Sequence, residues 1–294
     1  MIRLIPVGLQ NKFMGHHYVP QYYLRGFSPG FGQKLWVYDK QQEQPFSSHV
    51  KSVANICKFY SDELESHLAE KVEDPANFVL DKIRKKTEIS KNDKVTLAEY
   101  IAVLWKRVPE GKVRFINSAP QIAERLQTEI NEGIDELVKK ESHLFDLGEK
   151  RKNEVESVIQ RFSENPPDDI WHQVIPAGST PNMIDALSEM TWRYFVHDEK
   201  PVFLTCDNPV FFFSGIGIGK SNSELSFPIS SNITLQATRN PEHAEGYFPA
   251  NKQVVMELNR RTAHNATRFC FHALKEDWVL PFLNKGKRQL KSII

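Results

Sequence analysis

The spacing of apolar residues predicts a helical region in the middle of the chain. Between residues 61 and 165, apolar side chains recur every three or four positions, as in Leu64 and Leu68, which is the period of an amphipathic helix. Ser61 and the acidic residues after it suit a helix N-terminus. The pattern predicts helices from Ser61 with a kink at Pro75, from Asn92 to about Arg107, from Pro109 to about Leu144 with an interruption near Pro120, and over residues 150–162.

Alternating runs on both sides of this region predict strands. In the N-terminal part these are Lys34–Tyr38 and Phe46–Val50, separated by a turn-prone stretch. Asn165–Asp169 ends the helical pattern. Beyond it, the pattern predicts strands over Ile170–Ile175, Val202–Cys206, Val210–Phe213, Ile233–Ala237 and Arg268–His272, and helices from Thr180 to about Phe195 and from about Lys252 to Asn265.

These elements predict an α+β fold. We expect a mixed, largely antiparallel sheet built from the N- and C-terminal parts, with the helical middle region as an elaboration. Residues 1–60 would form an N-terminal motif and hairpin of the sheet domain, residues 61–165 the helical region, and residues 166–294 the mixed part that completes the sheet.

Composition restricts the classes of partner. The 294 residues include 38 basic and 37 acidic side chains, so a net charge of +1 gives no global field that demands nucleic acid or anionic lipid. Residues 1–60 carry a local excess of seven basic over two acidic residues. No run approaches the ~20 apolar residues of a membrane span.

The compartment and the start of translation are less constrained. There is no secretory signal pattern, and three widely spaced cysteines have no metal-binding spacing, so we expect a cytoplasmic protein with reduced thiols. Either Met1 or Met14 could be the native start.

Several phrases along the chain together suggest a family. They are His16–Pro20, Tyr23–Phe27, Leu35–Tyr38, Phe59–Tyr60, Arg107–Pro109, Trp192, Phe203–Pro209, Pro228–Ser230, Leu258–Asn259, Ala266 and Arg268–Phe269. Over nearly the whole chain, this set resembles the bacterial domain-of-unknown-function family 4238, although that family usually has Ser where this chain has Cys206. The resemblance implies one intracellular domain type, often encoded near mobile-element and defence genes. It implies no established reaction.

The N-terminal phrase contains the most suggestive polar residues. A histidine titrates near neutral pH, so His17 could act as a general acid or base, while Arg25 could steady an anionic phosphate and His16 could contact substrate. The alternative interpretation is architectural: the polar side chains fix a loop by hydrogen bonds while the neighbouring aromatic residues pack.

A second candidate group lies in the C-terminal part. Asp207 follows an apolar strand, where a carboxylate is well placed to hold a divalent cation such as Mg²⁺ or Mn²⁺. Asn208, Asn259 and Arg268 could complete a phosphate-binding face. Turn chemistry explains the Asp207–Pro209 phrase equally well, and the arginine could be a solvated charge.

Two further patterns imitate known motifs. Ser214–Ser221 resembles a phosphate-binding loop, but its first glycine is a serine and no helix pattern follows it. Asp168 with Asp198–Lys200 imitates the carboxylates and lysine of metal-dependent nucleases, but Lys200 precedes a proline in an expected turn. We interpret both as chance.

Together these features predict a phosphate-handling enzyme, namely a metal-dependent nuclease of a bacterial defence or toxin setting. In this hypothesis His17, Arg25 and Asp207 are catalytic, Asp207 also holds the metal, and nucleic acid is the substrate. The alternative is a non-enzymatic sensor or adaptor that binds protein or nucleic acid through amphipathic middle helices, especially Ile122–Val138, or that forms homo-oligomers. The sequence specifies neither the reaction and substrate nor the oligomeric state.

Overall fold

Strands from the two ends of the chain share one sheet. The computed structural model describes residues 15–177, 181–213, 218–284 and 290–292. The four-stranded sheet has the order β3, β2, β11, β6, with bounds Phe46–His49, Lys34–Asp39, Phe269–His272 and Thr205–Cys206. All its pairs are antiparallel. The expected sheet built from N- and C-terminal parts is therefore confirmed.

A five-stranded sheet forms from the C-terminal part alone. Its order is β10, β5, β9, β8, β7, with bounds Gly246–Pro249, Thr191–Val196, Ile233–Thr238, Glu224–Ser230 and Phe211–Phe212. Every pair is antiparallel except β10 with β5, which is parallel. Every residue of β8 and β9 is buried, because other elements cover both faces of these central strands. A separate two-stranded pair joins β1 (Gly15–His17) to β4 (Asn55–Cys57).

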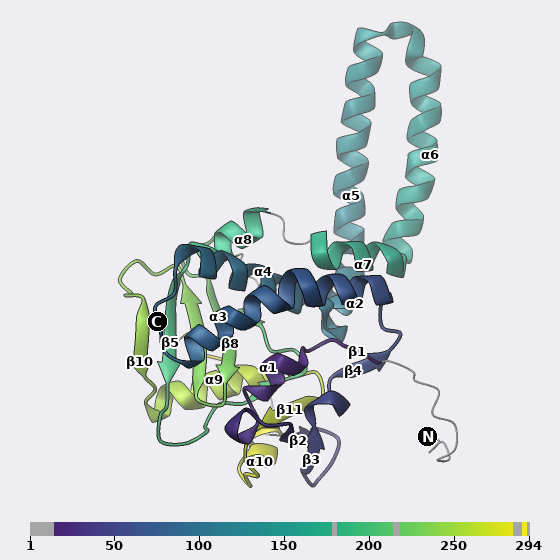
Figure 1. Ribbon diagram of the computed structural model, residues 1–294. Helices are drawn as coiled ribbons and strands as arrows, with labels where there is room; N and C mark the ends of the chain where they lie inside the picture. The colour runs from purple at the N-terminus through teal and green to yellow at the C-terminus, as the bar shows by residue number, and fades with distance from the viewer. Residues whose placement is uncertain (1–14, 178–180, 214–217, 285–289, 293–294) are drawn as a thin grey trace, which may run out of the picture.

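Helices cover the sheets and fill the middle of the chain (Figure 1). Ser61 caps α2, and a capping box at Ser90 begins α4, as polar residues at helix starts are expected to do. The α-helices of the body are α1 (Gln21–Arg25), α2 (Asp62–Leu68), α3 (Asp74–Arg84), α4 (Lys91–Arg107), α7 (Asp168–Ala177), α8 (Pro181–Ser188), α9 (Lys252–Asn265) and α10 (Val279–Asn284). A π-helical segment, Ala69–Glu73, joins α2 to α3 just before Pro75, where a kink was expected.

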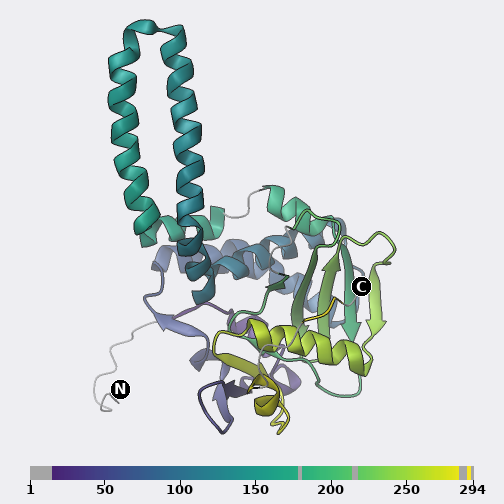
Figure 2. The ribbon, with the colours of Figure 1, turned by 180° about the vertical axis from the view of Figure 1, so that it is seen from behind.

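Two long helices project from this body as an antiparallel hairpin. They are α5 (Pro109–Lys140) and α6 (Phe145–Glu164), and Figures 1 and 2 show them extending together away from both sheets. The buried residues of α5 all lie in its first half, ending at Ala123. At the base, Phe115 meets Phe162 edge to face at 6.2 Å. Beyond the base, the two helices pack chiefly on each other.

Three sequence-based expectations about elements are wrong, and some strands were not predicted. Residues 170–175 form part of α7 and not a strand, because Trp171 and Ile175, one helical turn apart, are both buried in the main core. The helix expected to reach Phe195 ends at Ser188, and β5 follows it. Helix α5 continues through Pro120 without interruption. The strands β8 and β10 were not foreseen.

Candidate functional site

Among the described residues, no hydrogen bond or ion pair joins the N-terminal candidates His16, His17 and Arg25 to the C-terminal candidates. His16 is buried and stacks on the ring of Tyr60 at 5.0 Å. Its Nε2 lies 2.9 Å from Asp62 Oδ1, and its Nδ1 accepts the N–H of Tyr60 at 3.2 Å. Both ring nitrogens therefore serve the packing of β1 on α2, and His16 is not available to contact a substrate.

His17 borders a buried charged group that we call the Arg107 cluster, made of Tyr60, Glu65, Glu73 and Arg107. Arg107 is 1% exposed, and its guanidinium donates to Glu73, to the Tyr60 hydroxyl and to the His17 carbonyl. Burial would lower the pKa of Arg107, but the charge of Glu73 raises it above its usual value. The tyrosine hydroxyl also donates to the His17 carbonyl at 3.0 Å.

The imidazole of His17 is held at one nitrogen only. Its Nε2 lies 3.1 Å from the carbonyl oxygen of Lys51, which selects the tautomer with the proton on Nε2. Burial lowers the pKa of His17, so the ring is neutral at pH 7. No described residue bonds to Nδ1, which leaves a basic lone pair there. This is the arrangement of a general base, although no phosphate-binding group among the other predicted residues accompanies it.

Arg25 lies apart from His17, in the last turn of α1. Its Nε is buried without a hydrogen-bond partner among the described residues. Burial and the hydrogen bond to Asp81 raise the pKa of Tyr22, and the charges of Arg84 and Arg25 oppose that shift. Tyr22 donates to Asp81 Oδ2 on α3, so Arg25 faces the α1–α3 side of the molecule.

Asp207 accepts three backbone hydrogen bonds at the start of β11. The donors are the N–H groups of Thr267, Arg268 and Phe269, at 2.8, 2.8 and 3.0 Å. The carboxylate is 4% exposed, and burial raises its pKa while the three donors oppose that shift. Asp207 thus fixes the turn into β11. The three backbone hydrogen bonds give Asp207 this architectural role.

The two candidate asparagines are also bonded to backbone. Asn208 Nδ2 donates to the Asn265 carbonyl at 3.1 Å. Asn259 accepts the N–H of Leu204 at 2.9 Å and donates to the carbonyl of Val202 at 2.7 Å, so it holds the irregular chain before β6 against α9. Their role as substrate contacts is not supported by this geometry.

Arg268 forms a bidentate ion pair with Asp39 across the β2–β11 edge. Its Nε lies 3.0 Å from Oδ1 and its Nη2 2.6 Å from Oδ2, and this pairing holds the pKa of Asp39 below its usual range. Burial, and then the charge of Asp207, raise the pKa of the Tyr18 hydroxyl. Arg268 is therefore neutralised and not a free phosphate ligand.

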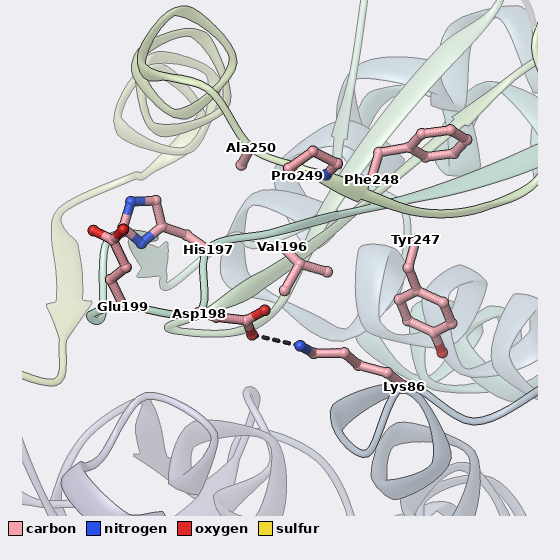
Figure 3. A pocket seen from close by; sticks show the side chains of 9 residues that line it. All are labelled: Lys86, Val196, His197, Asp198, Glu199, Tyr247, Phe248, Pro249 and Ala250. Atoms are coloured by element: carbon pink, nitrogen blue, oxygen red, sulfur yellow. Dashed lines mark hydrogen bonds and ion pairs between the residues drawn. The ribbon is translucent and has the colours of Figure 1, made fainter.

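An open hollow of about 440 Å³ lies elsewhere, at the β5–β10 edge (Figure 3). Lys86 and Asp198 form an ion pair of 2.5 Å within it, while His197 and Glu199 lie together at one end. Asp168 of the imitated nuclease motif is not among the lining residues, since it pairs with Lys112 instead. Across the described part of the chain, no three histidine, cysteine or acidic side chains converge as metal ligands. Nor is any helix there long and apolar enough to traverse a bilayer.

Comparison with protein families resolves what kind of chain this is. The model of a family described as a protein of unknown function (DUF4238) matches residues 15–276. The chain belongs to this family. No curated protein and no solved structure matches the DUF4238 chain significantly.

The family phrases gather around two places in the structure. His17, Tyr60 and Arg107 come from three of the phrases and meet at the Arg107 cluster. Asp207 and Arg268 come from two others and meet at the start of β11. Sequence reasoning missed the roles of Arg107 and Tyr60, although both lay within phrases that carried the resemblance to DUF4238 proteins.

Proposed function

We propose that the protein is a non-enzymatic sensor or adaptor that assembles through the α5–α6 hairpin, with a second copy of the chain as the partner. The observation that carries this proposal is the apolar surface of the hairpin. Ile116, Ile130 and Leu137 follow each other at multiples of seven residues on α5 and are 42, 37 and 58% exposed. Residues at this spacing share one side of a helix, so they form an apolar stripe that is exposed at both ends and interrupted by the buried Ala123 between Ile116 and Ile130.

The second helix extends the apolar surface. Leu147 and Val158 lie three turns apart on α6 and are 50 and 58% exposed. Phe145, at the end of the hairpin that Figure 1 places farthest from the body, is 59% exposed. Two helices packed on each other bury only the apolar side chains at their mutual contact, and other apolar side chains stay exposed. Four helices can enclose a common apolar core. Two hairpins packed together would therefore cover the stripe.

The charges of the hairpin favour this partner. Between Glu124 and Glu136, α5 carries five acidic residues and one basic residue, while Lys150, Arg151 and Lys152 follow each other on α6. The two parts lie at the same level of the hairpin, where Lys152 pairs with Asp135 at 2.6 Å. Packing of two hairpins side by side would therefore set the acidic part of each α5 near the basic part of the other copy's α6. Complementary charges of this kind fix the orientation of a complex.

Light scattering coupled to size-exclusion chromatography tests the proposal. The wild-type chain should elute as a dimer of twice 34.0 kDa. Leu137→Glu places a charge in the apolar stripe and should weaken association about a hundredfold, which corresponds to roughly 2.7 kcal/mol. Phe78→Glu is the matched control, because Phe78 is 74% exposed on α3, outside the hairpin. A wild-type monomer at about 100 μM would refute the proposal.

Phosphodiester hydrolysis is a second candidate function, and it is favoured by the unoccupied Nδ1 of His17. In this proposal His17 acts as the general base of a nuclease in a bacterial defence or toxin setting. In this proposal Arg25, whose side chain makes no hydrogen bond or ion pair with the described residues, would contact a phosphate of the nucleic acid at a distance from His17. A Mg²⁺ or Mn²⁺ ion would need ligands other than Asp207.

Labelled RNA and DNA, incubated with the protein and Mg²⁺ or Mn²⁺, test the nuclease proposal. His17→Gln should abolish cleavage while leaving the circular dichroism spectrum unchanged. His197→Gln, in the hollow of Figure 3, is the control and should cleave normally. Absence of cleavage by the wild-type chain, or equal cleavage by His17→Gln, would eliminate His17 as a catalytic residue.

A further inference from the structure

Charged side chains lie buried between α9 and the five-stranded sheet. Arg261 of α9 and Glu224 of β8 form an ion pair of 2.7 Å, and both side chains are fully buried. Glu257, one turn before Arg261, is 9% exposed and points the same way. Gln236 of β9 donates to Glu224. A helix that packs on a sheet normally does so through apolar residues, so this polar interface requires a cause.

A segment from the end of the described chain occupies this interface. Lys291 N–H donates to Glu257 Oε1 at 2.8 Å, and Arg261 Nη2 donates to the Lys291 carbonyl at 2.7 Å. The Ser292 hydroxyl donates to Glu224. Figure 2 shows α9 crossing this face of the sheet. The charged cluster thus binds both the N–H and the carbonyl group of Lys291 and the hydroxyl group of Ser292.

The charged cluster is incomplete without the segment. Arg261 Nε has no hydrogen-bond partner, and its nearest acidic oxygen, on Glu257, is 3.9 Å away. Removal of Lys291 would leave Glu257 without its N–H donor and Arg261 without its carbonyl acceptor. Buried charges that lose hydrogen-bond partners are strongly destabilising. The groups are therefore arranged to bind a peptide and not merely to pair with each other.

The site also has room beyond the bound segment. A hollow of about 570 Å³ is bordered by Lys291 and Ser292 on one side and by α9 residues, including Glu257 and Arg260, on the other. The main-chain contacts to Lys291 are independent of its side chain, which is exposed. Only the hydroxyl contact selects a residue type. These features specify an extended peptide with Ser or Thr at the second position.

We infer that the groove beside α9, above the buried pair of Arg261 and Glu224, is a peptide-binding site, and that residues 290–292 occupy it as an internal competitor. The ligand is an extended segment whose main chain bridges Glu257 and Arg261 and whose next residue carries a hydroxyl group for Glu224. Displacement of the internal segment opens the site. This inference is independent of the hairpin and of His17.

Binding of a labelled peptide to the full chain tests the inference. The probe is a fluorescein-labelled peptide with the sequence of residues 287–294, followed by fluorescence anisotropy. Lys291→Pro removes the N–H that Glu257 accepts, so the internal segment should no longer compete and the peptide should bind at least about tenfold tighter than to wild type. Lys291→Ala keeps both main-chain groups and should behave as wild type. Equal binding by the two variants would overturn the inference.

Hydrogen exchange of the wild-type chain gives a second readout that needs no variant. The Lys291 amide is donated to a buried carboxylate, so it should exchange at least about a hundredfold more slowly than in the free peptide. Exchange at the free-peptide rate would mean that the segment does not occupy the groove, and would also overturn the inference. As a specificity control, a probe with alanine in place of the serine should bind more weakly to Lys291→Pro.

Discussion

At the scale of single residues, several polar side chains that the sequence indicated as functional candidates form hydrogen bonds to the backbone instead. Asp207 is the clearest case, because three N–H groups from consecutive residues converge on its carboxylate. This gives Asp207 a measurable role in stability. A purely functional carboxylate would leave stability unchanged when replaced by its amide.

Asp207→Asn should destabilise the fold by about 2–4 kcal/mol, since an amide nitrogen would face N–H donors that a carboxylate oxygen now accepts. Urea denaturation followed by fluorescence measures this change. Asp198→Asn is the matched control: its ion pair with Lys86 is exposed, so its loss should cost less than about 1 kcal/mol. An unchanged midpoint for Asp207→Asn would contradict the architectural role.

His272 predicts how stability depends on pH. The ring is buried, and its Nδ1 lies 3.0 Å from the carbonyl oxygen and 3.2 Å from the N–H of Leu274. Burial lowers the pKa of His272 below the ordinary 6.5, although the contact with the Leu274 carbonyl opposes that shift. The unfolded chain therefore binds a proton that the folded chain resists, and the free energy of unfolding should fall as the pH drops below about 6.5.

The slope contributed by one such histidine is at most 1.36 kcal/mol per pH unit. His272→Gln should flatten the profile of unfolding free energy between pH 7 and pH 5, measured by urea denaturation. His143→Gln, on the exposed hairpin, is the control and should keep the wild-type slope. A steeper acid loss in His272→Gln would show that the sign is wrong.

The sequence could locate candidate side chains but could not tell which polar atoms were already used. Asp207 and Asn208 were correctly placed at a turn, yet their partners lie about sixty residues away in sequence, at 265–269. Arg107 was overlooked for the same reason, because Glu73 and Tyr60 reach it only through the packing of α2, α3 and α4. Burial of charge is a tertiary property that local patterns do not contain.

At the scale of elements, the α5–α6 hairpin depends on a close approach at Gly148. A Cβ at this position would lie 2.8 Å from a methyl group of Val138 and 3.3 Å from one of Ile134, both on α5. Gly133, also in the hairpin, has nothing within 4 Å of such an atom. The two glycines thus form a natural comparison.

Gly148→Leu should splay the hairpin and raise amide exchange in α5 and α6 by at least about tenfold, because the side chain would overpack a contact between stiff β-branched residues. Gly133→Leu should instead lower exchange there, since leucine has a better helix propensity than glycine. Hydrogen exchange with mass spectrometry measures both. Equal exchange in the two variants would contradict the close approach.

Helix patterns were more informative than strand patterns for this chain. The predicted helices from Asn92, Pro109 and Lys252 agree with α4, α5 and α9 within a few residues at their starts. The strands β8 and β9 are buried on both faces, yet their residues ELSFPIS and ITLQAT alternate between polar and apolar types. The β9 strand was predicted from its sequence, whereas β8 was missed although it carries the same alternation. Residues 170–175 were mistaken for a strand because a short apolar run fits either element, and its burial against the core decided for helix.

At the scale of the whole molecule, the hairpin and the body are nearly separate units. Replacing residues 124–153 with a short glycine-serine linker should leave the thermal unfolding of the body within about 2 °C, since the distal hairpin packs on itself. The same deletion should abolish the proposed dimer. Differential scanning calorimetry and light scattering measure the two effects. Unfolding of the body on deletion would show that the hairpin supports it.

The four-stranded sheet can form only late in synthesis, because its strands come from both ends of the chain. Strand β2 finds its partner β11 only after most of the chain exists, and the Asp39–Arg268 pair joins residues 229 positions apart. At roughly 5–20 residues per second, a ribosome needs on the order of 10–50 s to supply the missing strand. During that interval the apolar side chains of β2 are not yet packed against β11. The α5–α6 hairpin can already form, because its contacts are between residues close in sequence. Nascent chains of this protein are therefore natural clients for a chaperone that shields their first fifty residues.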